Sequence, residues 1–419
     1  MKRRQFIAGT AAAGLLGAAL LRPEDRGDGA HAPYFAQLQQ ALHQAGIAKP
    51  TMLIDLDRLD HNIAQMQQWL APGMGYRAVA KSLPSLTLLD YVGRQTNSKR
   101  LMVFHQPFLN QIATALPDAD LLLGKPMPVA AAQRYYQLHQ GRFDPARQLQ
   151  WLIDSPARLL EYAELARGLD STLQVNLEID VGLHRGGFQG SADFAEALRL
   201  LARTPQLQFS GLMGYEPQVA AAPAVLGLQR REFAAATAKY SEFLVQLRNA
   251  GLDRQGNCYN AAGSPTFRFW KPVTGIANEL SVGTGLLKPS DYDIPSLDSH
   301  RPAAFIATPV LKAQAGMQLP VLPAAGKAQA LWDPNRAQSF FIYGGYWKAE
   351  PVSPAGLKSN ALYGRSTNQE LLNGSARVKL QVGDSVFLRP TQSEFVLLQF
   401  GDLAAVRGGK IVDFWPVLG

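Results

Sequence analysis

The chain has 419 residues, 47% of them hydrophobic and 18% charged, so a large core is available and a mainly disordered chain is excluded. The net charge of +8 is not gathered into one basic run. This argues against nucleic-acid binding and favours mild attraction for an anionic cofactor or substrate. Cys258 is the single cysteine, so an internal disulfide and a cysteine-rich zinc site are both excluded.

The first 21 residues place a basic start ahead of a short, weakly apolar run. This run is too short and too mildly apolar for an ordinary membrane span. The adjacent Arg3 and Arg4 resemble a twin-arginine export signal. We expect residues 1–32 to be signal and linker and the protein to reach the periplasm, with no stable membrane span beyond this segment. A general secretory signal and an uncleaved anchor are the alternatives.

From residue 51 to about 290, strand-like and helix-like segments alternate. The first strand, at 51–56, runs directly into an amphipathic helix. Eight further strand candidates follow at 75–82, 100–105, 120–126, 149–155, 173–180, 207–216, 256–264 and 278–285. Apolar strands divided by helices indicate a parallel sheet, and eight repeats close a (β/α)8 barrel. We therefore expect an α/β fold with a TIM-type barrel over 33–300, and the surplus strand at 51–56 to pair in another domain.

Beyond Pro302 the segments become β-rich, with glycine turns and no convincing long helix. We expect residues 301–419 to form a separate C-terminal β domain. An aromatic cluster at 340–347 suits its core or a dimer surface, and a tyrosine from this domain is an alternative acid or base for catalysis.

A barrel carries its chemistry at the carboxyl ends of its strands, so polar residues there are the candidates. Lys81 closes the first barrel strand, where partial desolvation would lower its pKa and suit Schiff-base formation. A lysine that only reaches to the barrel rim is the alternative. After the fifth strand, Glu178, Asp180, His184 and Arg185 crowd together with glycines, which is costly unless the residues are used. A structural ion pair and a structural histidine are the alternatives there.

The last two barrel strands end in glycine with serine or threonine. Ser264 and Thr266 follow the seventh strand, and Gly283 and Thr284 follow the eighth. Bare backbone N–H groups and hydroxyls at these ends form the usual phosphate cradle of a barrel. Ordinary turns are the alternative, and neither loop carries a nucleotide P-loop.

A lysine at strand one and a phosphate cradle at strands seven and eight point to an aldehyde cofactor that bears a phosphate. The chain resembles the fold-type III pyridoxal phosphate (PLP) enzymes, the alanine-racemase barrel class. Within it, most of residues 48–419 resemble the D-threonine aldolase and D-serine dehydratase family. Residues 76–82 match the family's Arg-Pro-His-x-Lys-Thr segment, which implies the Schiff-base role for Lys81 and a cofactor contact for Arg77. The resemblance also places Arg185 at the phenolic oxygen of the cofactor and Tyr215 in the pocket.

The chain departs from the family at the late metal motif, where Gln392 and Glu394 replace the two ligands. An amide oxygen is a poor zinc or manganese ligand, so we expect no metal there. The resemblance implies a lyase of the aldolase type that acts on a small D-3-hydroxy amino acid such as D-threonine, in a homodimer. Glu394 and His184 are the candidate bases for the hydroxyl proton. The alternatives are a D-amino-acid dehydratase or racemase on the same scaffold, or a PLP-binding protein with little turnover.

Overall fold

The computed structural model describes residues 22–316 and 329–419. The expected export signal at 1–21 lies outside the described residues. The chain divides into two compact units, each discontinuous in sequence. The barrel unit comprises Ile54–Ala304, Gln392–Ala405 and Asp413–Gly419, and the sheet unit comprises the described residues of 22–53, 305–391 and 406–412. The sequence predicts one domain boundary near residue 300. In the structure, residues 392–405 also belong to the barrel unit, although they lie beyond that boundary.

Eight parallel strands form the closed barrel that the sequence predicts, in the order of the chain. They are β2 (Gly75–Val79), β3 (Arg100–Val103), β4 (Asp120–Leu123), β5 (Leu149–Ile153), β6 (Leu173–Ile179), β7 (Leu207–Gly214), β8 (Cys258–Ala261) and β9 (Glu279–Val282). The barrel closes where β9 pairs with β2, with Gly75 opposite Glu279 and Ala78 opposite Val282. All eight carboxyl ends therefore meet at one mouth.

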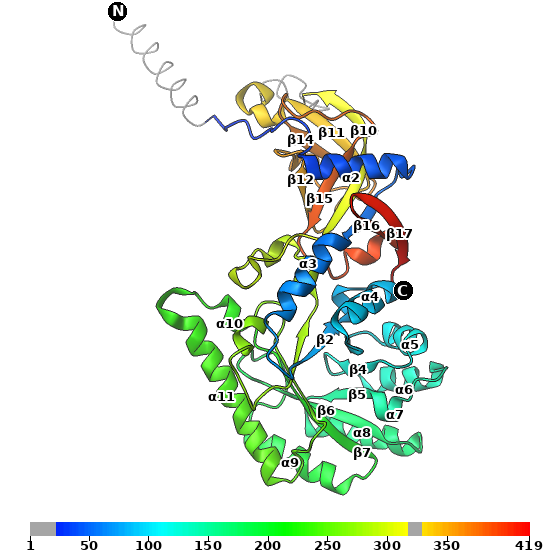
Figure 1. The fold of residues 1–419 in the computed structure, drawn as a ribbon, viewed down its shortest axis with the longest axis vertical. Helices are drawn as coiled ribbons and strands as arrows, with labels where there is room; N and C mark the ends of the chain where they lie inside the picture. Colours follow the sequence, from blue (N-terminus) through cyan, green and yellow to red (C-terminus); the bar gives the residue numbers. More distant parts are fainter. Residues whose placement is uncertain (1–21, 317–328) are drawn as a thin grey trace, which may run out of the picture. The chain divides into compact units, whose positions relative to one another are not determined.

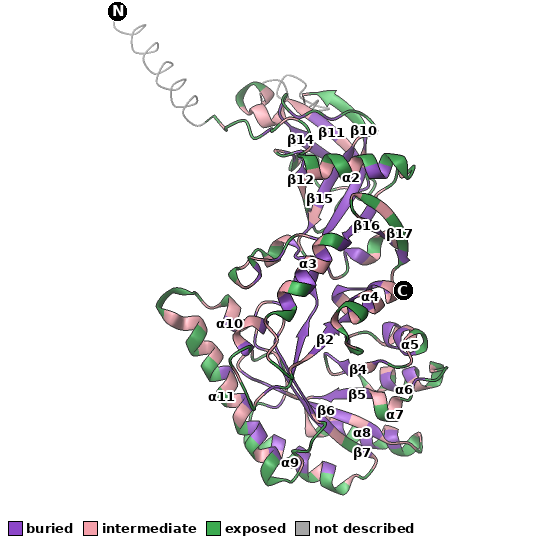
Figure 2. Cartoon of the chain, viewed as in Figure 1, coloured by how far each residue is buried: buried purple, intermediate pink, exposed green. Residues whose placement is uncertain are grey.

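Helices follow most barrel strands and cover their outer face, where the strands are almost wholly buried (Figures 1 and 2). The helices of this unit are α3 (Leu56–Gln67), α4 (Leu86–Thr96), α5 (Gln106–Ala115), α6 (Val129–Leu138), α7 (Pro145–Gln148), α8 (Pro156–Gly168), α9 (Ser191–Arg203), α10 (Gln218–Ala221), α11 (Leu228–Asn249) and α12 (Thr284–Leu287). Short 3-10 turns are η1 (Ala80–Ser82), η2 (Val225–Gly227), η3 (Phe267–Trp270), η4 (Ser290–Tyr292), η5 (Pro295–Leu297) and η7 (Leu397–Phe400). Within 22–316 and 329–419, every helix is too short or too polar to cross a bilayer.

Local sequence signals set where these helices begin. Ser155 precedes α8 and accepts a hydrogen bond from the backbone N–H of Arg158, while Pro156 occupies the first helical position. Asp55 caps α3 in the same way, at 2.9 Å from the N–H of Arg58. Such caps satisfy backbone donors that the first turn leaves unpaired.

The sheet unit is built on a nine-stranded sheet, whose main order is β13-β14-β11-β10-β1-β16-β17, and β15 pairs with β10 and β12. The strands of this sheet, of which β16 and β17 are shared between the two units, and the helices of the sheet unit are α2 (Pro33–Gln44), β1 (Thr51–Asp55), β10 (Ala304–Ala315), η6 (Pro334–Arg336), β11 (Gln338–Tyr343), β12 (Ala349–Ser353), β13 (Lys358–Ser359), β14 (Gln369–Gly374), β15 (Ser385–Pro390), β16 (Asp402–Arg407) and β17 (Lys410–Pro416). The ring of Phe35, on α2, packs against those of Phe305 and Phe387 at 5.2 and 5.1 Å between centroids. The first strand of the chain, β1, lies between β10 and β16 and so belongs to this sheet and not to the barrel.

Candidate active site

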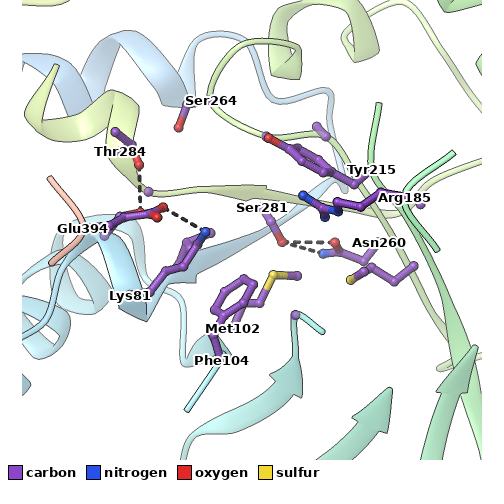
Figure 3. Close-up of a pocket in the computed structure, with 18 of the residues that line it drawn as sticks. Lys81, Met102, Phe104, Arg185, Tyr215, Asn260, Ser264, Ser281, Thr284 and Glu394 are labelled. Carbon is purple, nitrogen blue, oxygen red and sulfur yellow. Dashed lines mark hydrogen bonds and ion pairs between the residues drawn. The ribbon is translucent and has the colours of Figure 1, made fainter. Parts of the chain in front are cut away.

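A pocket opens at the mouth of the barrel, and its lining comes from the carboxyl ends of the strands and the loops that follow them (Figure 3). The lining residues are Val79, Lys81, Ser82, Met102, Phe104, Gly124, Arg185, Met213, Gly214, Tyr215, Asn260, Ala262, Gly263, Ser264, Ser281, Gly283, Thr284, Tyr292 and Glu394. Glu394 comes from the late segment 392–405, which belongs to the barrel unit. The pocket therefore combines strand ends with one residue from beyond the barrel sequence.

Lys81 forms the central ion pair of the pocket. It follows β2 in the turn η1, and its Nζ lies 2.9 Å from Oε1 of Glu394. The two side chains are 40% and 37% exposed, so solvent screening leaves the pair little weight in stability. The Lys81 Nζ also lies 4.6 Å from the centre of the Phe104 ring. A carboxylate and an aromatic face thus hold the amine at the centre of the pocket.

Hydroxyls and glycines gather at the ends of β8 and β9. The Ser82 hydroxyl lies 2.8 Å from that of Thr284 and donates to Glu394 at 3.3 Å. The Ser264 hydroxyl accepts the backbone N–H of Gly285 at 2.9 Å, which leaves its own proton available for a ligand. A Cβ at Gly263 would stand 2.6 Å from the Tyr215 ring. Position 263 therefore requires glycine. Without a side chain there, the backbone is open at this end of the pocket.

Arg185 presents a cation to the pocket from the loop after β6. Its guanidinium lies 5.3 Å from the centre of the Tyr215 ring, and it makes no ion pair or hydrogen bond with the described residues. Glu178 lies nearby on β6, and burial, together with the charge of Asp154, raises the pKa of Glu178 to about 7, against the effect of Arg185. A carboxyl that is partly protonated near neutral pH leaves the positive charge of Arg185 available for another anion.

The same loop is anchored at its root by Asp180. The Asp180 carboxylate accepts the backbone N–H groups of Gly182 and His184 at 2.9 and 3.0 Å, and Nδ1 of His184 lies 2.8 Å away. These hydrogen bonds lower the pKa of Asp180 against the opposing effect of burial. His184 has a left-handed backbone with a φ of 57°, and its side chain is 69% exposed. His184 thus closes a tight turn outside the pocket lining, and Arg185 follows directly.

Behind Tyr215, the buried Glu216 ties down the loop after β8. Its carboxylate accepts the Thr266 hydroxyl at 2.6 Å, the indole N–H of Trp270 at 3.0 Å and the backbone N–H of Ala262 at 3.3 Å. Burial raises the pKa of Glu216, against these hydrogen bonds, and burial also raises the pKa of Tyr215. Thr266 is therefore committed to the loop and does not line the pocket.

Arg77 lies deeper in the barrel. Its side chain is fully buried, with Nε 2.5 Å from Glu279 and Nη2 3.1 Å from Asp120. A strand rises about 3.3 Å per residue, so Arg77 lies one interior layer below Val79 at the mouth. It is not a lining residue, and its charge is matched inside the barrel. The structure therefore leaves Arg77 outside the pocket in which a cofactor contact was expected.

Asn260 and Ser281 form the polar floor of the pocket. The Asn260 amide donates to Glu279 at 2.7 Å and to the Ser281 hydroxyl at 2.8 Å. Because a carboxylate only accepts, Glu279 fixes which end of the amide faces it. The floor therefore has a defined hydrogen-bonding orientation.

The structure brings seven of the sequence-predicted site residues to one pocket and leaves three outside it. The lining includes Lys81, Arg185, Tyr215, Ser264, Gly283, Thr284 and Glu394. Arg77, His184 and Thr266 lie elsewhere, for the reasons given above. Sequence reasoning did not single out Phe104, Tyr292 or the pair Asn260 and Ser281. Within the described ranges, no group of three or more His, Cys, Asp or Glu side chains is arranged to hold a metal ion.

The chain thus forms a closed parallel barrel with a lysine, an arginine and a cluster of hydroxyls at the carboxyl ends of its strands, which is where barrel enzymes carry their active sites. The family model for the alanine racemase N-terminal domain matches residues 54–291, which is more than half of the chain. The chain therefore belongs to the alanine racemase N-terminal domain family of fold-type III PLP enzymes.

Two similar proteins are named for different reactions. A 3-hydroxy-D-aspartate aldolase from Paracoccus denitrificans is 22% identical over 385 residues, which cover 90% of this chain and 93% of that protein. An alanine racemase from Limosilactobacillus fermentum is 25% identical over 279 residues, which cover 63% of this chain and 67% of that protein.

Two solved structures share the fold over most of the chain. D-threonine aldolase from Filomicrobium marinum aligns with a TM-score of 0.68 and 17% identity, and covers 88% of this chain and 95% of its own. D-threo-3-hydroxyaspartate dehydratase from Delftia sp. HT23 aligns with a TM-score of 0.68 and 19% identity, and covers 88% of this chain and 97% of its own. At these identities the likeness shows the fold alone.

Proposed function

We propose that this protein is a PLP-dependent carbon–carbon lyase of the aldolase type, acting on a small D-3-hydroxy amino acid such as D-threonine. The observation that carries the proposal is the pair of Lys81 and Glu394, an amine and a carboxylate 2.9 Å apart in the pocket. A lyase that acts on a 3-hydroxy amino acid needs an amine that bonds the cofactor and a base that accepts the proton of the substrate hydroxyl. Lys81 and Glu394 are the residues that would supply them.

The residues present fit PLP. Lys81 would bond its aldehyde carbon. The hydroxyls of Ser264 and Thr284, beside bare Gly263 and Gly283, would hold the phosphate, because hydroxyls and open backbone suit a phosphate anion. Arg185 has no ion partner among the described residues and would face an anionic oxygen, beside the flat ring of Tyr215.

When bound, PLP supplies an electron-withdrawing ring that accepts the electron pair released at the substrate Cα. The protein's own groups handle the protons. Glu394 would take the proton that Lys81 must lose before its amine can react, since the two form an ion pair, and would release it to solvent, to which the Glu394 side chain is 37% exposed. Once ionised again, Glu394 would be the carboxylate of the pocket lining that accepts the proton of a substrate β-hydroxyl. The Cα–Cβ bond can then break, giving an aldehyde, and return of a proton to Cα gives glycine.

Ser82 orients the base. Its hydroxyl donates to Oε1 of Glu394, the same oxygen that pairs with Lys81. This hydrogen bond keeps one carboxylate oxygen turned toward the amine. The structure thus favours Glu394 over His184 as the base, because the His184 ring is paired with Asp180 outside the pocket lining.

Dehydration on the same site is the second candidate. Lys81 is the one lysine in the described pocket lining, and removal of the Cα proton by Lys81 would start loss of the hydroxyl. Glu394 would then donate a proton to the departing hydroxyl instead of accepting one. Both routes use Lys81 and Glu394. In the aldolase route Glu394 accepts the hydroxyl proton, whereas in the dehydratase route Lys81 removes the Cα proton and Glu394 donates a proton to the hydroxyl.

Product analysis of the holoenzyme separates the candidates. Incubation with D-threonine should give acetaldehyde and glycine in equal amounts. A keto acid with ammonia would mean a dehydratase, and L-allo-threonine alone, from inversion at Cα, would mean a racemase. No product from a panel of D-3-hydroxy amino acids would leave a binding protein with little turnover and would overturn the lyase assignment.

We also propose export to the periplasm by the twin-arginine route and a homodimeric assembly. The adjacent Arg3 and Arg4 before an apolar run support export. Changing both to lysine should trap the protein in the cytoplasm, and unchanged export of that double variant would rule the route out. Size measurement in solution tests the dimer.

A further inference from the structure

The loop between α10 and α11 presents an apolar tip to solvent. It projects from the barrel unit (Figure 1), and four consecutive apolar residues in it are exposed, namely Pro223, Ala224, Val225 and Leu226. The exposed fraction reaches 65% at Val225 and 96% at Leu226. Single exposed apolar residues are ordinary on a protein surface, whereas contiguous ones mark interaction sites. None of the four lines the active-site pocket, so the chemistry of the pocket does not account for them.

A hydrogen-bonded turn holds Leu226 away from the rest of the protein. Leu226 and Gly227 are both left-handed, with φ of 56° and 70°, and the backbone N–H of Leu228 donates to the carbonyl of Val225. A left-handed backbone is unfavourable for a residue with a side chain, and a leucine that is 96% exposed gains almost no packing in return. The turn therefore exposes its leucine at a cost to folding, which indicates a contact with another surface.

Two arginines follow the tip directly. Arg230 and Arg231 are exposed and lie within the first four residues of α11, and neither forms an ion pair with a residue that the structure describes. Cations are unfavourable at the start of a helix, where the helix dipole is positive, and the first turn of α11 has no acidic residue to offset them. Residues 222–231 carry two positive charges and no negative one. An apolar protrusion thus adjoins a positive charge that the protein leaves uncompensated.

We propose that residues 223–226, together with Arg230 and Arg231, form a docking surface for an anionic phospholipid bilayer. The aliphatic side chains of the tip enter the boundary between headgroups and acyl chains, and the arginines pair with lipid phosphates. The negative surface of such a bilayer complements the positive charge beside the tip. Docking of this kind is independent of the reaction in the pocket.

The size of the tip favours a bilayer over a protein partner. A stable protein interface buries about 800 Å² on each partner, and four residues at a narrow turn offer far less apolar surface. A bilayer needs no matching pocket, because its headgroup region accepts short aliphatic groups directly. The contact is weak and reversible, since even a single acyl chain gives only marginal binding.

The first test measures sedimentation of the full-length protein with lipid vesicles. We expect binding to vesicles of phosphatidylglycerol and phosphatidylcholine in equal parts, and weaker binding to phosphatidylcholine alone. The double variant Val225→Ser with Leu226→Ser should bind the mixed vesicles at least about tenfold more weakly, because it removes the aliphatic groups that insert. Arg230→Gln with Arg231→Gln should weaken binding to the mixed vesicles about tenfold or more and change binding to phosphatidylcholine little.

Matched variants elsewhere on the barrel unit are the controls. Leu160→Ser removes an exposed leucine from α8, and Arg199→Gln with Arg203→Gln removes two exposed arginines from α9. Both should bind as the wild type does. Wild-type binding by the tip variants would contradict docking at the tip, and so would an equal loss in the arginine control, which would show a general attraction of a basic protein. Loss of a dimer in Val225→Ser with Leu226→Ser, with vesicle binding unchanged, would make the tip an interface between copies of the chain.

A probe at the tip reports insertion directly, independently of any binding by the apolar N-terminal segment. Cys258 is the only cysteine and is buried, so Ala224→Cys supplies an exposed thiol for a polarity-sensitive fluorophore. With mixed vesicles, we expect its emission to shift to shorter wavelength and to be quenched by a quencher attached to the acyl chains. The same label on Ala202→Cys, an exposed position of α9, should change little. An unchanged spectrum at position 224, or equal changes at both positions, would refute lipid docking by this tip.

Discussion

The Glu394 carboxylate lies 2.9 Å from the Nζ of Lys81, although Glu394 follows the entire barrel in the sequence. Glu394→Gln keeps the shape of this side chain and removes its ability to accept a proton. We expect kcat to fall by about 100-fold or more, the usual contribution of a positioned acid or base, while cofactor absorbance is retained. Glu196→Gln, an exposed position on α9, is the control. A kcat near that of the wild type would remove Glu394 from the mechanism.

The second prediction concerns the loop that presents Arg185. Asp180→Ala removes three hydrogen bonds at the root of this loop, two of them to backbone N–H groups. We expect the Kd for PLP to rise about tenfold or more, since each hydrogen bond to a charged group contributes about 1.5–3 kcal/mol. His184→Ala removes the ring alone and should change the Kd and kcat little. A large loss of kcat in His184→Ala would instead make His184 a catalytic residue.

Metal content gives the third prediction. Gln392 and Glu394 offer one amide and one carboxylate, which are weak ligands for zinc or manganese without an imidazole. Protein purified without chelator should contain well under one equivalent of either metal, and its activity should survive dialysis against EDTA. Near-stoichiometric zinc or manganese that Glu394→Ala removes would contradict this and restore a metal-assisted mechanism.

The fourth prediction concerns His300 and the dependence of stability on pH. His300 is 3% exposed, and neither ring nitrogen has a hydrogen-bond partner in the described structure. Burial and the charges of Arg268 and Lys288 lower the pKa of His300 from 6.5 to about 4. Between these two values the unfolded chain binds a proton that the folded chain does not. Stability should therefore be full above pH 6.5 and fall as the pH drops toward 4.

The variant His300→Phe keeps an aromatic ring beside Phe267, whose centroid lies 6.2 Å from that of His300. The difference in Tm between pH 7.5 and pH 5 should be smaller in this variant than in the wild type. His43→Ala, at an exposed position, is the control and should behave as the wild type. An equal acid-induced loss of Tm in the wild type and in His300→Phe would show that His300 does not cause it.

The barrel could be predicted from the sequence because eight apolar runs recur with helices between them, and this periodicity is local. Lys81 could be placed for the same reason, since a residue that ends a barrel strand must lie at the mouth. For Arg77, the sequence did not show how deep its side chain lies. It faces the barrel interior on the same strand as Val79, but one layer lower, and only the positions of Glu279 and Asp120 show that its charge is already matched.

The rest of the site depends on which distant segments meet. Phe104 and Tyr292 line the pocket because of the directions in which their loops leave the barrel. The periodicity of the sequence does not predict the direction that a loop takes. Glu394 could be noticed as a departure from a family motif, but its distance from Lys81 follows from the return of 392–405 to the barrel unit. His184 could not be separated from a pocket residue without its left-handed turn and its hydrogen bond to Asp180.

Lys81 is the residue that we propose bonds PLP. The direct measurement is borohydride reduction of the holoenzyme, followed by proteolysis and mass analysis of the peptide that contains Lys81. We predict that this peptide gains the mass of a reduced pyridoxyl phosphate group, and that Lys81→Ala loses both the label and the visible absorbance of the bound cofactor. A pyridoxyl label on another lysine, or a reducible cofactor that persists in Lys81→Ala, would contradict the account.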